Sequence, residues 1–423
     1  MRRTSGLRVL AVCALAGIAA PVCADAVSDW NEIAVDAVTA GRPGPTGMVD
    51  VALVQVAVHD AVQALDRRYE PYHAEVPGAR GRRSAAVAAA AHGVLVGLYP
   101  AQAPALDSRY FSWLAEHGLS SDAGLEVGHE VAAQILPLRR MTPDPLPPPF
   151  IGSTAPGSWR PTDSKLGDPP LPAPFSPMAA PWMASFDPFT LTSPARFRAA
   201  PPPAITSETY ARDYQEVKAL GSLNSTARSA GQTDLAYFYS DNFITQWNRA
   251  LRGIAARHSR HPGESARLFA LVNVAMADAL ITCWDSKVHY VYWRPETAIH
   301  EGDNDDNAAT SGDPSWQPLV NNPNYPDFTS GANALTGAAT RALELYFGTD
   351  HMVFEMTSLA PQAKRKSRWY RRFSDVASDV VEARILLGIH FRFADVAART
   401  QGRRTAEWTV RHFLLPLGKR HGD

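Results

Sequence analysis

Lys287 and Arg294 are two cationic residues seven positions apart in a stretch rich in aromatic residues. On a helix, seven residues make about two turns, so the two side chains would project from nearly the same face. Like charges on one apolar face repel each other unless an anion lies between them. The spacing therefore favours an anion site. Ordinary ion pairs with nearby aspartates such as Asp285 are the alternative.

Ser330 and Gly331 open a helical run directly after a turn-forming segment that begins at Tyr325. The first backbone N–H groups of a helix lack intrahelical acceptors, and the helix dipole favours an anion at that end. The serine hydroxyl adds one more donor. The pair predicts a second part of an anion site, although a serine that only caps the helix is the commoner role.

Arg384 and His390 form a third group near the C-terminus. They are six residues apart, which does not place them on one face of a straight helix, but Gly388 between them allows the chain to bend. An arginine fork suits two oxygens of a tetrahedral anion, and an imidazole can act as a nucleophile or a metal ligand. The alternative is a structural histidine in an apolar core, whose ring nitrogens are hydrogen-bonded within the protein.

The three groups occur in the order Lys-x6-Arg-Pro, Ser-Gly and Arg-x3-Gly-x-His. This order resembles the superfamily of vanadium-dependent haloperoxidases and type-2 phosphatidic acid phosphatases, and most closely its secreted bacterial haloperoxidase-like branch. The segments Asp29-Trp30-Asn31, His59-Asp60-Ala61-Val62 and Trp284–Ile299 are similar as well. The resemblance covers most of the chain. It implies an all-α fold, a helical bundle of the haloperoxidase and acid phosphatase type.

The resemblance also implies a binding site for vanadate, which phosphate could occupy. Three cations would bind the oxygens of the anion and act in catalysis. His390 would bond vanadium in a peroxidase, or be the phosphorylated nucleophile in a phosphatase. Preorganised cations suit both, because vanadate with an axial histidine resembles the transition state of phosphoryl transfer. The implied cofactor-binding residues are Lys287, Arg294, Ser330, Gly331, Arg384 and His390.

Ala332 departs from the family motif, which usually reads Ser-Gly-His at this point. Alanine cannot transfer a proton, and general acid–base catalysis typically contributes roughly 10²–10⁴-fold. His289 and His300 are candidate replacements, and Asp241 is a candidate to orient a site arginine. Ala383 also stands where a serine often precedes the arginine. Oxyanion binding is expected to persist, and full chloride-oxidising activity is in doubt.

These features predict an exported vanadate-dependent haloperoxidase-like enzyme that oxidises halide with hydrogen peroxide. A soluble acid phosphatase with a phosphohistidine intermediate is one alternative. An oxyanion-binding protein with weakened catalysis is another. The expected partners are small molecules, namely peroxide and halide or a phosphate ester.

Four segments of the chain would position these residues. Residues 1–24 combine arginines with the apolar run Leu7–Ala20, which predicts a signal peptide cleaved after residue 24 or 26. Residues 27–141 are predicted to be helices. Residues 142–206 are predicted to be a proline-rich strap anchored by aromatic rings, with a flexible linker as the alternative. Residues 207–423 would form a helical catalytic bundle that packs with the N-terminal helices as one domain.

The composition is that of a soluble globular protein, with 45% hydrophobic and 20% charged residues in a chain of 423. A formal net charge of −1 argues against nucleic-acid binding through bulk positive charge. No segment after the predicted signal peptide approaches the ~18 uninterrupted apolar residues of a membrane span. We therefore expect a periplasmic or secreted protein without a membrane span.

Helical periodicity and cap residues predict the elements of both helical segments. The expected N-terminal helices are Met48–Leu65, Ser84–Tyr99, Ala103–Glu116 and Ser121–Leu136. The expected C-terminal helices are Ser207–Leu220, Thr226–Asn242, Glu264–Trp293, Ser330–Phe347, Lys364–Leu387 and Thr400–Leu414.

Overall fold

The computed structural model describes residues 25–42, 44–138, 148–162 and 177–418. Helices dominate these residues, which confirms the predicted all-α fold. The predicted signal peptide, residues 1–24, lies outside the described residues, and so does part of the predicted strap.

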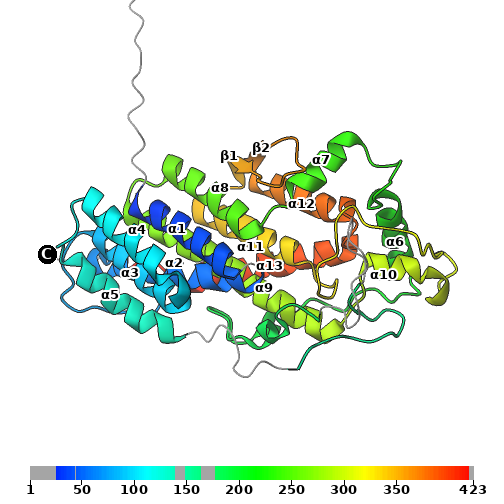
Figure 1. The fold of residues 1–423 in the computed structure, drawn as a ribbon, viewed down its shortest axis with the longest axis horizontal. Coiled ribbons are helices and arrows are strands. Elements are labelled where there is room, and N and C mark those ends of the chain that lie inside the picture. The colour runs from blue at the N-terminus through cyan, green and yellow to red at the C-terminus, as the bar shows by residue number, and fades with distance from the viewer. Residues whose placement is uncertain (1–24, 43, 139–147, 163–176, 419–423) are drawn as a thin grey trace, which may run out of the picture.

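The N-terminal helices lie together on one side of the elongated molecule (Figure 1). The alanine-rich α3 is buried over most of its length, and it packs against α2 and α5 because its short side chains let neighbouring helices approach. All four helices predicted for this segment are present. The bounds are α1 (Ala26–Gly41), α2 (Thr46–Asp66), α3 (Arg83–Leu98), α4 (Ala103–Glu116) and α5 (Gly124–Ile135).

The C-terminal helices surround α9, which packs against α2, α11 and α13. Ser207 caps α6 by accepting a hydrogen bond from the N–H of Tyr210, as its position before the helix predicts. Helix α8 is absent from the predicted elements, and α13 begins eight residues earlier than predicted. The bounds are α6 (Glu208–Leu220), α7 (Ala230–Phe238), α8 (Phe243–His258), α9 (Pro262–Tyr290), α10 (Pro295–His300), α11 (Gly331–Phe347), α12 (Phe373–Leu386) and α13 (Arg392–His412).

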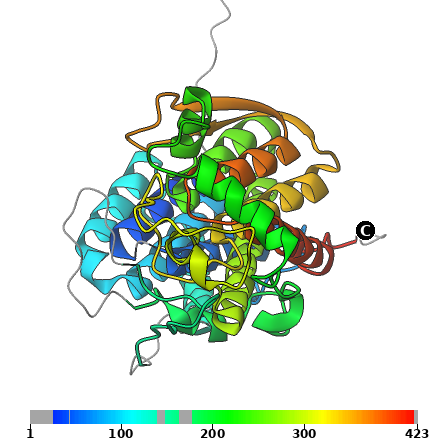
Figure 2. The same ribbon diagram turned by 90° about the vertical axis from the view of Figure 1, so that its right-hand side faces the viewer.

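The helix predicted over Lys364–Leu387 is wrong in its first part. Residues Ser367–Arg372 form strand β2, which pairs antiparallel with β1 (His351–Thr357) at the periphery of the molecule (Figures 1 and 2). Tyr370 is buried against Phe354, while its charged neighbours point to solvent. Pairing with a distant strand therefore overrides the local helical preference of the basic run.

Two helices, α2 and α9, are long and apolar enough to cross a membrane by length and composition alone. In the folded protein, 89% and 94% of their most apolar windows are buried. Packing within the protein core therefore accounts for their apolar character.

The described parts of the proline-rich segment lie against α9. Trp159 is buried, and the backbone N–H groups of Phe189 and Thr190 donate to the carboxylate of Asp278 on α9 at 2.6 and 2.8 Å. The Thr190 hydroxyl donates to the same carboxylate at 2.6 Å. The buried ring of Trp159 and the hydrogen bonds to Asp278 thus hold the segment against the helices.

Helices α11 and α13 touch through their backbones. A Cβ atom on Gly402 would lie 2.1 Å from the Ala334 carbonyl oxygen, and one on Gly337 would lie 2.4 Å from that of Arg399. Glycine at both positions is therefore required for this close approach. The contact sets the start of α11 beside the start of α13, where several of the predicted site residues lie.

Candidate oxyanion-binding site

Lys287 lies in the last turn of α9 with a fully buried side chain. Its Nζ donates to the backbone carbonyls of Pro326 and Asp327, the latter at 3.1 Å. The ammonium also lies 4.8 Å from the ring centroid of Tyr325. Burial, with the neighbouring Arg294, lowers the pKa of Lys287 to about 7. The loop that leads into α11 thus holds this cation.

The spacing predicted that Arg294 and Lys287 share one helix face, and this prediction is wrong. Val291 adopts a left-handed conformation with φ 49° and ends α9, so Arg294 instead caps α10. Its buried guanidinium donates from Nε to the Tyr325 carbonyl at 2.9 Å and from Nη1 to the Ile389 carbonyl at 2.6 Å. The Nη2 atom is buried without a hydrogen-bond partner among the described residues. The two cations still meet, through tertiary structure rather than helical periodicity.

His390 lies between Arg294 and Asp327. Its Nε2 is 3.3 Å from Arg294 Nη1, and its Nδ1 is 2.7 Å from Asp327 Oδ1. Because a guanidinium only donates, Nε2 must accept and Nδ1 carries the proton. Burial and the nearby cations hold the pKa of His390 well below its usual value. The imidazole is therefore neutral, with its Nε2 lone pair facing the cations.

Asp327 is a site residue that the motif analysis did not identify. It is fully buried, and burial raises the pKa of its carboxyl to about 7 against the opposing effect of Arg294 and Lys287. Its Oδ2 has no hydrogen-bond partner among the described residues. A charged residue between Pro326 and Phe328, in a stretch that feeds a helix, is the sequence signal that could have identified it.

Arg384 reaches the same site from the last turn of α12. Its Nη1 donates to the Tyr239 carbonyl at 3.2 Å, whereas its Nε is buried without a partner. Its charge lowers the pKa of His390. Gly388 makes the expected bend, with φ 79° and a Cβ position only 2.4 Å from the Gly221 carbonyl oxygen.

Ser330 and Gly331 lie at the N-terminus of α11. Ser330 is the N-cap residue, but its hydroxyl makes no capping hydrogen bond. The side chain accepts a hydrogen bond from Asn333 Nδ2 at 3.4 Å and interacts with the carboxyl of Asp395 on α13. Gly331 is the first residue of the helix, so its N–H has no intrahelical acceptor. The helix start therefore offers donors that the protein itself does not use.

Three other candidates from the sequence lie elsewhere. His289 is exposed, and His300 Nε2 is 2.7 Å from the Trp316 carbonyl oxygen. Asp241 pairs with Arg249 at 3.5 Å and accepts from the N–H of Leu359 at 2.8 Å. The expectation that Asp241 orients a site arginine is therefore wrong, because it anchors the segment after β1 instead.

Three comparisons with known proteins bear on the fold that carries these residues. Residues 267–417, which include Asp327 and all six predicted oxyanion-binding residues, match the family model of the second helical-bundle domain of vanadium chloroperoxidase. The vanadium chloroperoxidase of Curvularia inaequalis is 27% identical over an alignment of 293 positions, and the match covers 53% of this chain. The chain spans about half the length of that relative, since the match covers 48% of it.

Residues 267–417 thus resemble one domain of vanadium chloroperoxidase, and bacterial vanadium-dependent peroxidases of known structure share the fold of most of the chain. A bacterial vanadium-dependent iodoperoxidase has the same fold, with a TM-score of 0.77, 23% identity, and coverage of 92% of this chain and 97% of that one. A bacterial vanadium-dependent chloroperoxidase in its holo form gives a TM-score of 0.71 at 16% identity, covering 90% of this chain and 95% of the other. At these identities the structural likeness establishes the fold alone.

The buried polar atoms of the candidate site fit a tetrahedral oxyanion. Arg294 Nη2 and Arg384 Nε point to no acceptor among the described residues. Burying a guanidinium nitrogen without a partner is costly, so such atoms mark positions where a ligand oxygen would restore hydrogen bonds. Lys287 and the start of α11 complete a set of donors around the neutral His390.

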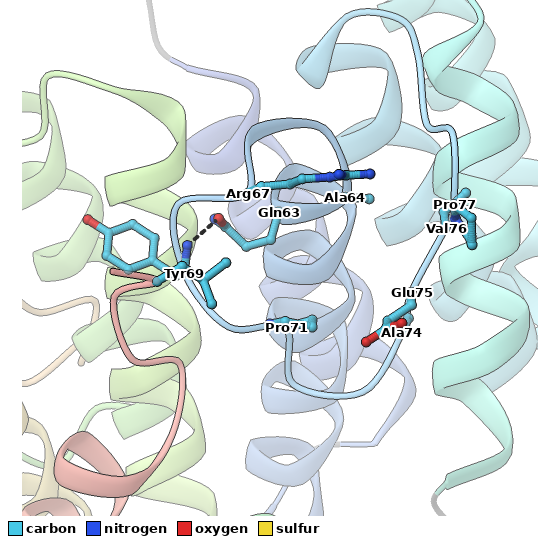
Figure 3. A pocket seen from close by; sticks show the side chains of 10 residues that line it. Gln63, Ala64, Arg67, Tyr69, Pro71, Ala74, Glu75, Val76 and Pro77 are labelled. Carbon is cyan, nitrogen blue, oxygen red and sulfur yellow. Dashed lines mark hydrogen bonds between the residues drawn. The ribbon is translucent and has the colours of Figure 1, made fainter. Parts of the chain in front are cut away.

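A separate hollow lies at the end of α2, away from these residues (Figure 3). It has a volume of about 250 Å³ and is lined in part by Gln63, Arg67 and Glu75. None of the predicted oxyanion-binding residues lines it. Gln63 instead organises the local loop, because its Oε1 accepts from the N–H groups of Arg68 and Tyr69 at 3.1 and 3.0 Å.

Proposed function

We propose that the protein is an exported vanadate-dependent haloperoxidase that oxidises halide with hydrogen peroxide. One observation carries the proposal: one buried guanidinium nitrogen of Arg294 and one of Arg384 lack hydrogen-bond partners among the described residues, beside the buried His390. A cluster of desolvated cations around an unprotonated imidazole nitrogen is suited to binding a metal oxyanion. Export rests on the predicted signal peptide.

The cationic residues and His390 would have different roles at the site. Lys287, Arg294 and Arg384 would bind and neutralise the anion's oxygens, with help from the Ser330 hydroxyl and the Gly331 N–H. His390 would bond the metal through Nε2, which its Nδ1 contact with Asp327 keeps unprotonated. Vanadate, when bound, would supply the Lewis acid that activates peroxide toward halide.

A phosphatase is the second candidate, because the same donors fit phosphate. The observation in its favour is again His390, whose Nε2 is unprotonated and therefore competent as a nucleophile. The two candidates predict opposite responses to vanadate. A haloperoxidase requires it, whereas a phosphatase is inhibited by it.

The test begins with the purified protein freed of bound anions. Vanadate is titrated first, and then iodide and bromide oxidation by peroxide and hydrolysis of p-nitrophenyl phosphate are assayed. Halide oxidation that appears only with vanadate supports the proposal. Ester hydrolysis that vanadate inhibits supports the phosphatase, and tight vanadate binding with neither activity leaves an oxyanion-binding protein.

Matched histidine variants test the site itself. His390→Ala is expected to abolish vanadate-dependent activity and weaken vanadate binding. His300→Ala removes a half-buried imidazole whose Nε2 hydrogen-bonds the Trp316 carbonyl, away from the candidate site, so it is expected to leave both unchanged. Equal vanadate binding by the two variants would contradict the role of His390.

A further inference from the structure

Another pocket lies between the proline-rich segment and α13, and no function described above uses it. Its walls include Phe197 and Pro203 of that segment and Phe393 and Ala397 of α13. The pocket has a volume of about 440 Å³, which is within the range of roughly 300–1,000 Å³ that small-molecule sites occupy. None of the six predicted oxyanion-binding residues lines it. The pocket is therefore a separate feature of the molecule.

The pocket is lined mainly by aromatic rings and small apolar residues. Three of the rings are Phe197, Phe328 and Phe393, and the ring centroids of the last two are 6.2 Å apart. Val396, which also lines the pocket, has 39% of its surface exposed. Apolar side chains at a hollow in contact with water favour a ligand whose own apolar surface would cover them. Phenyl rings favour an aromatic group, which can pack against them edge to face or offset.

The pocket lining includes three polar residues, and two of them already have partners. Gln401 uses its amide group for three hydrogen bonds within the core. Thr400 donates its hydroxyl proton to the Val396 carbonyl at 3.0 Å. Arg404 differs from both, because among the described residues its guanidinium has no hydrogen bond and no ion pair. Its Cζ lies over the ring of Phe197, 4.8 Å from the centroid.

Arg196 brings a second cation to the same ring. It lies in the short 3₁₀ helix Pro194–Phe197, and its Cζ is 3.8 Å from the ring centroid of Trp408 and 5.5 Å from that of Phe197. Its hydrogen bond among the described residues is to the Thr192 hydroxyl, at 3.4 Å. Two exposed guanidiniums thus lie over one ring that lines the pocket.

The nearby Arg198 shows how the same segment pairs an arginine that holds the fold together. Its Nε and Nη2 donate to the two carboxylate oxygens of Asp285 on α9, at 2.6 and 2.7 Å. Among the described residues, no carboxylate pairs with Arg196 or Arg404 in this way, and no acidic residue lines the pocket. Two cations without a counter-ion beside an apolar pocket are complementary to an anion with an apolar body.

We propose that this pocket binds a small aromatic carboxylate. The aromatic body lies among Phe197, Phe328 and Phe393, and the carboxylate pairs with Arg404 and Arg196. The proposal goes beyond the proposed function and does not require it, because no residue of the candidate oxyanion-binding site lines the pocket. The competing explanation is a pair of solvated arginines beside a surface hollow that binds nothing.

The test compares two probes that share one ring system, naphthoate and its neutral analogue naphthylmethanol. Each is titrated calorimetrically into the whole protein, with and without saturating vanadate. Naphthoate should bind about tenfold more tightly than naphthylmethanol, because only the carboxylate can pair with the guanidiniums. Vanadate should change the naphthoate affinity by less than about twofold, since the two sites share no residues.

Variants test the two ends of the pocket separately. Arg404→Gln should weaken naphthoate binding about tenfold and leave naphthylmethanol binding within about twofold. Arg411→Gln is the matched control, because it removes an exposed arginine from the same helix that does not line the pocket, and it should change neither affinity. Ala397→Trp places a large ring in the pocket and should abolish binding of both probes. Since Arg404 is exposed, its replacement keeps the test decisive if Ala397→Trp fails to fold.

Three results would overturn the proposal. The first is equal affinity for the two probes or unchanged naphthoate binding in Arg404→Gln, which would exclude recognition of the carboxylate. The second is displacement of naphthoate by vanadate or its loss in Arg384→Met, which would place the probe at the oxyanion-binding residues instead. The third is no binding of either probe. None of these results depends on whether the protein oxidises halide, so the proposed function is tested separately.

Discussion

Helix α2 and the loop before α11 each bury an aspartate, but the protein surrounds the two carboxyls differently. Asp60 on α2 accepts from the backbone N–H groups of Tyr72, His73 and Ala74 at 2.6, 2.9 and 2.8 Å. Both of its oxygens are used. The carboxyl therefore ties the chain after α2 to the helix and has no capacity left for a ligand.

Asp327 has the opposite surroundings. One oxygen contacts His390. Within the part of the chain that the structure describes, the other oxygen has no hydrogen-bond partner, and neither has one nitrogen of the neighbouring Arg294. The hydrogen bonding of a buried polar cluster therefore indicates whether the cluster serves stability or binding. A closed cluster contributes to stability, whereas a cluster with unused donors and acceptors forgoes stability and is suited to binding.

Asp60→Ala should give the largest effect on stability. The substitution leaves three backbone N–H groups without an acceptor, so the free energy of unfolding should fall by about 3 kcal/mol or more. Urea denaturation measures this loss. Vanadate affinity should change by less than about twofold because the two clusters share no partners. A loss below about 1 kcal/mol would show that the Asp60 cluster is not closed as described.

Arg384→Met should weaken vanadate binding strongly and change stability little, the reverse of Asp60→Ala. Removing a charge-assisted donor should raise the dissociation constant for vanadate about 30-fold, or about 2 kcal/mol. Without vanadate, the free energy of unfolding should change by less than about 1 kcal/mol, because the variant no longer buries an imperfectly paired charge. Calorimetric titration and urea denaturation of the same sample measure both. Strong destabilisation with unchanged binding would make Arg384 a structural residue.

His59→Gln should have a smaller effect, visible only in the pH dependence of stability. His59 on α2 is buried with Nε2 3.0 Å from the Glu70 carbonyl oxygen, and burial lowers its pKa to about 4. Below pH 6.5 the unfolded chain binds a proton that the folded protein does not. Stability is therefore complete above pH 6.5 and falls by up to about 1.4 kcal/mol per pH unit between 6.5 and 4.

Glutamine can keep the contact with Glu70 but does not titrate, so the variant should lose stability less steeply in that window. Urea denaturation at pH 7, 6 and 5 compares the two slopes. Asp60, whose pKa burial raises to about 6, acts in the opposite direction between 3.8 and 6, equally in both proteins. Identical slopes would mean that His59 is protonated in the folded state.

Much of the fold follows from local pattern, but elements that depend on distant partners do not. Ala103–Glu116 is a helix with the predicted bounds, because its periodicity and flanking residues agree. Ser367–Arg372 is a strand despite its helix-forming residues, since β1 pairs with it from outside the local window. Lys287 and Arg294 meet in space as expected, but a left-handed turn at Val291 brings them together rather than one helix face.

The sequence by itself determined the all-α class and the motif that names Lys287, Arg294 and His390, because residue type and chain order are what a motif records. Only the tertiary structure decided that Asp327 holds the Nδ1 side of His390, that Asp241 lies elsewhere, and that Asn333 on α11 donates to Asp395 on α13. These contacts join residues distant in sequence across helices that meet at glycines. Burial then sets their protonation, which no local pattern encodes.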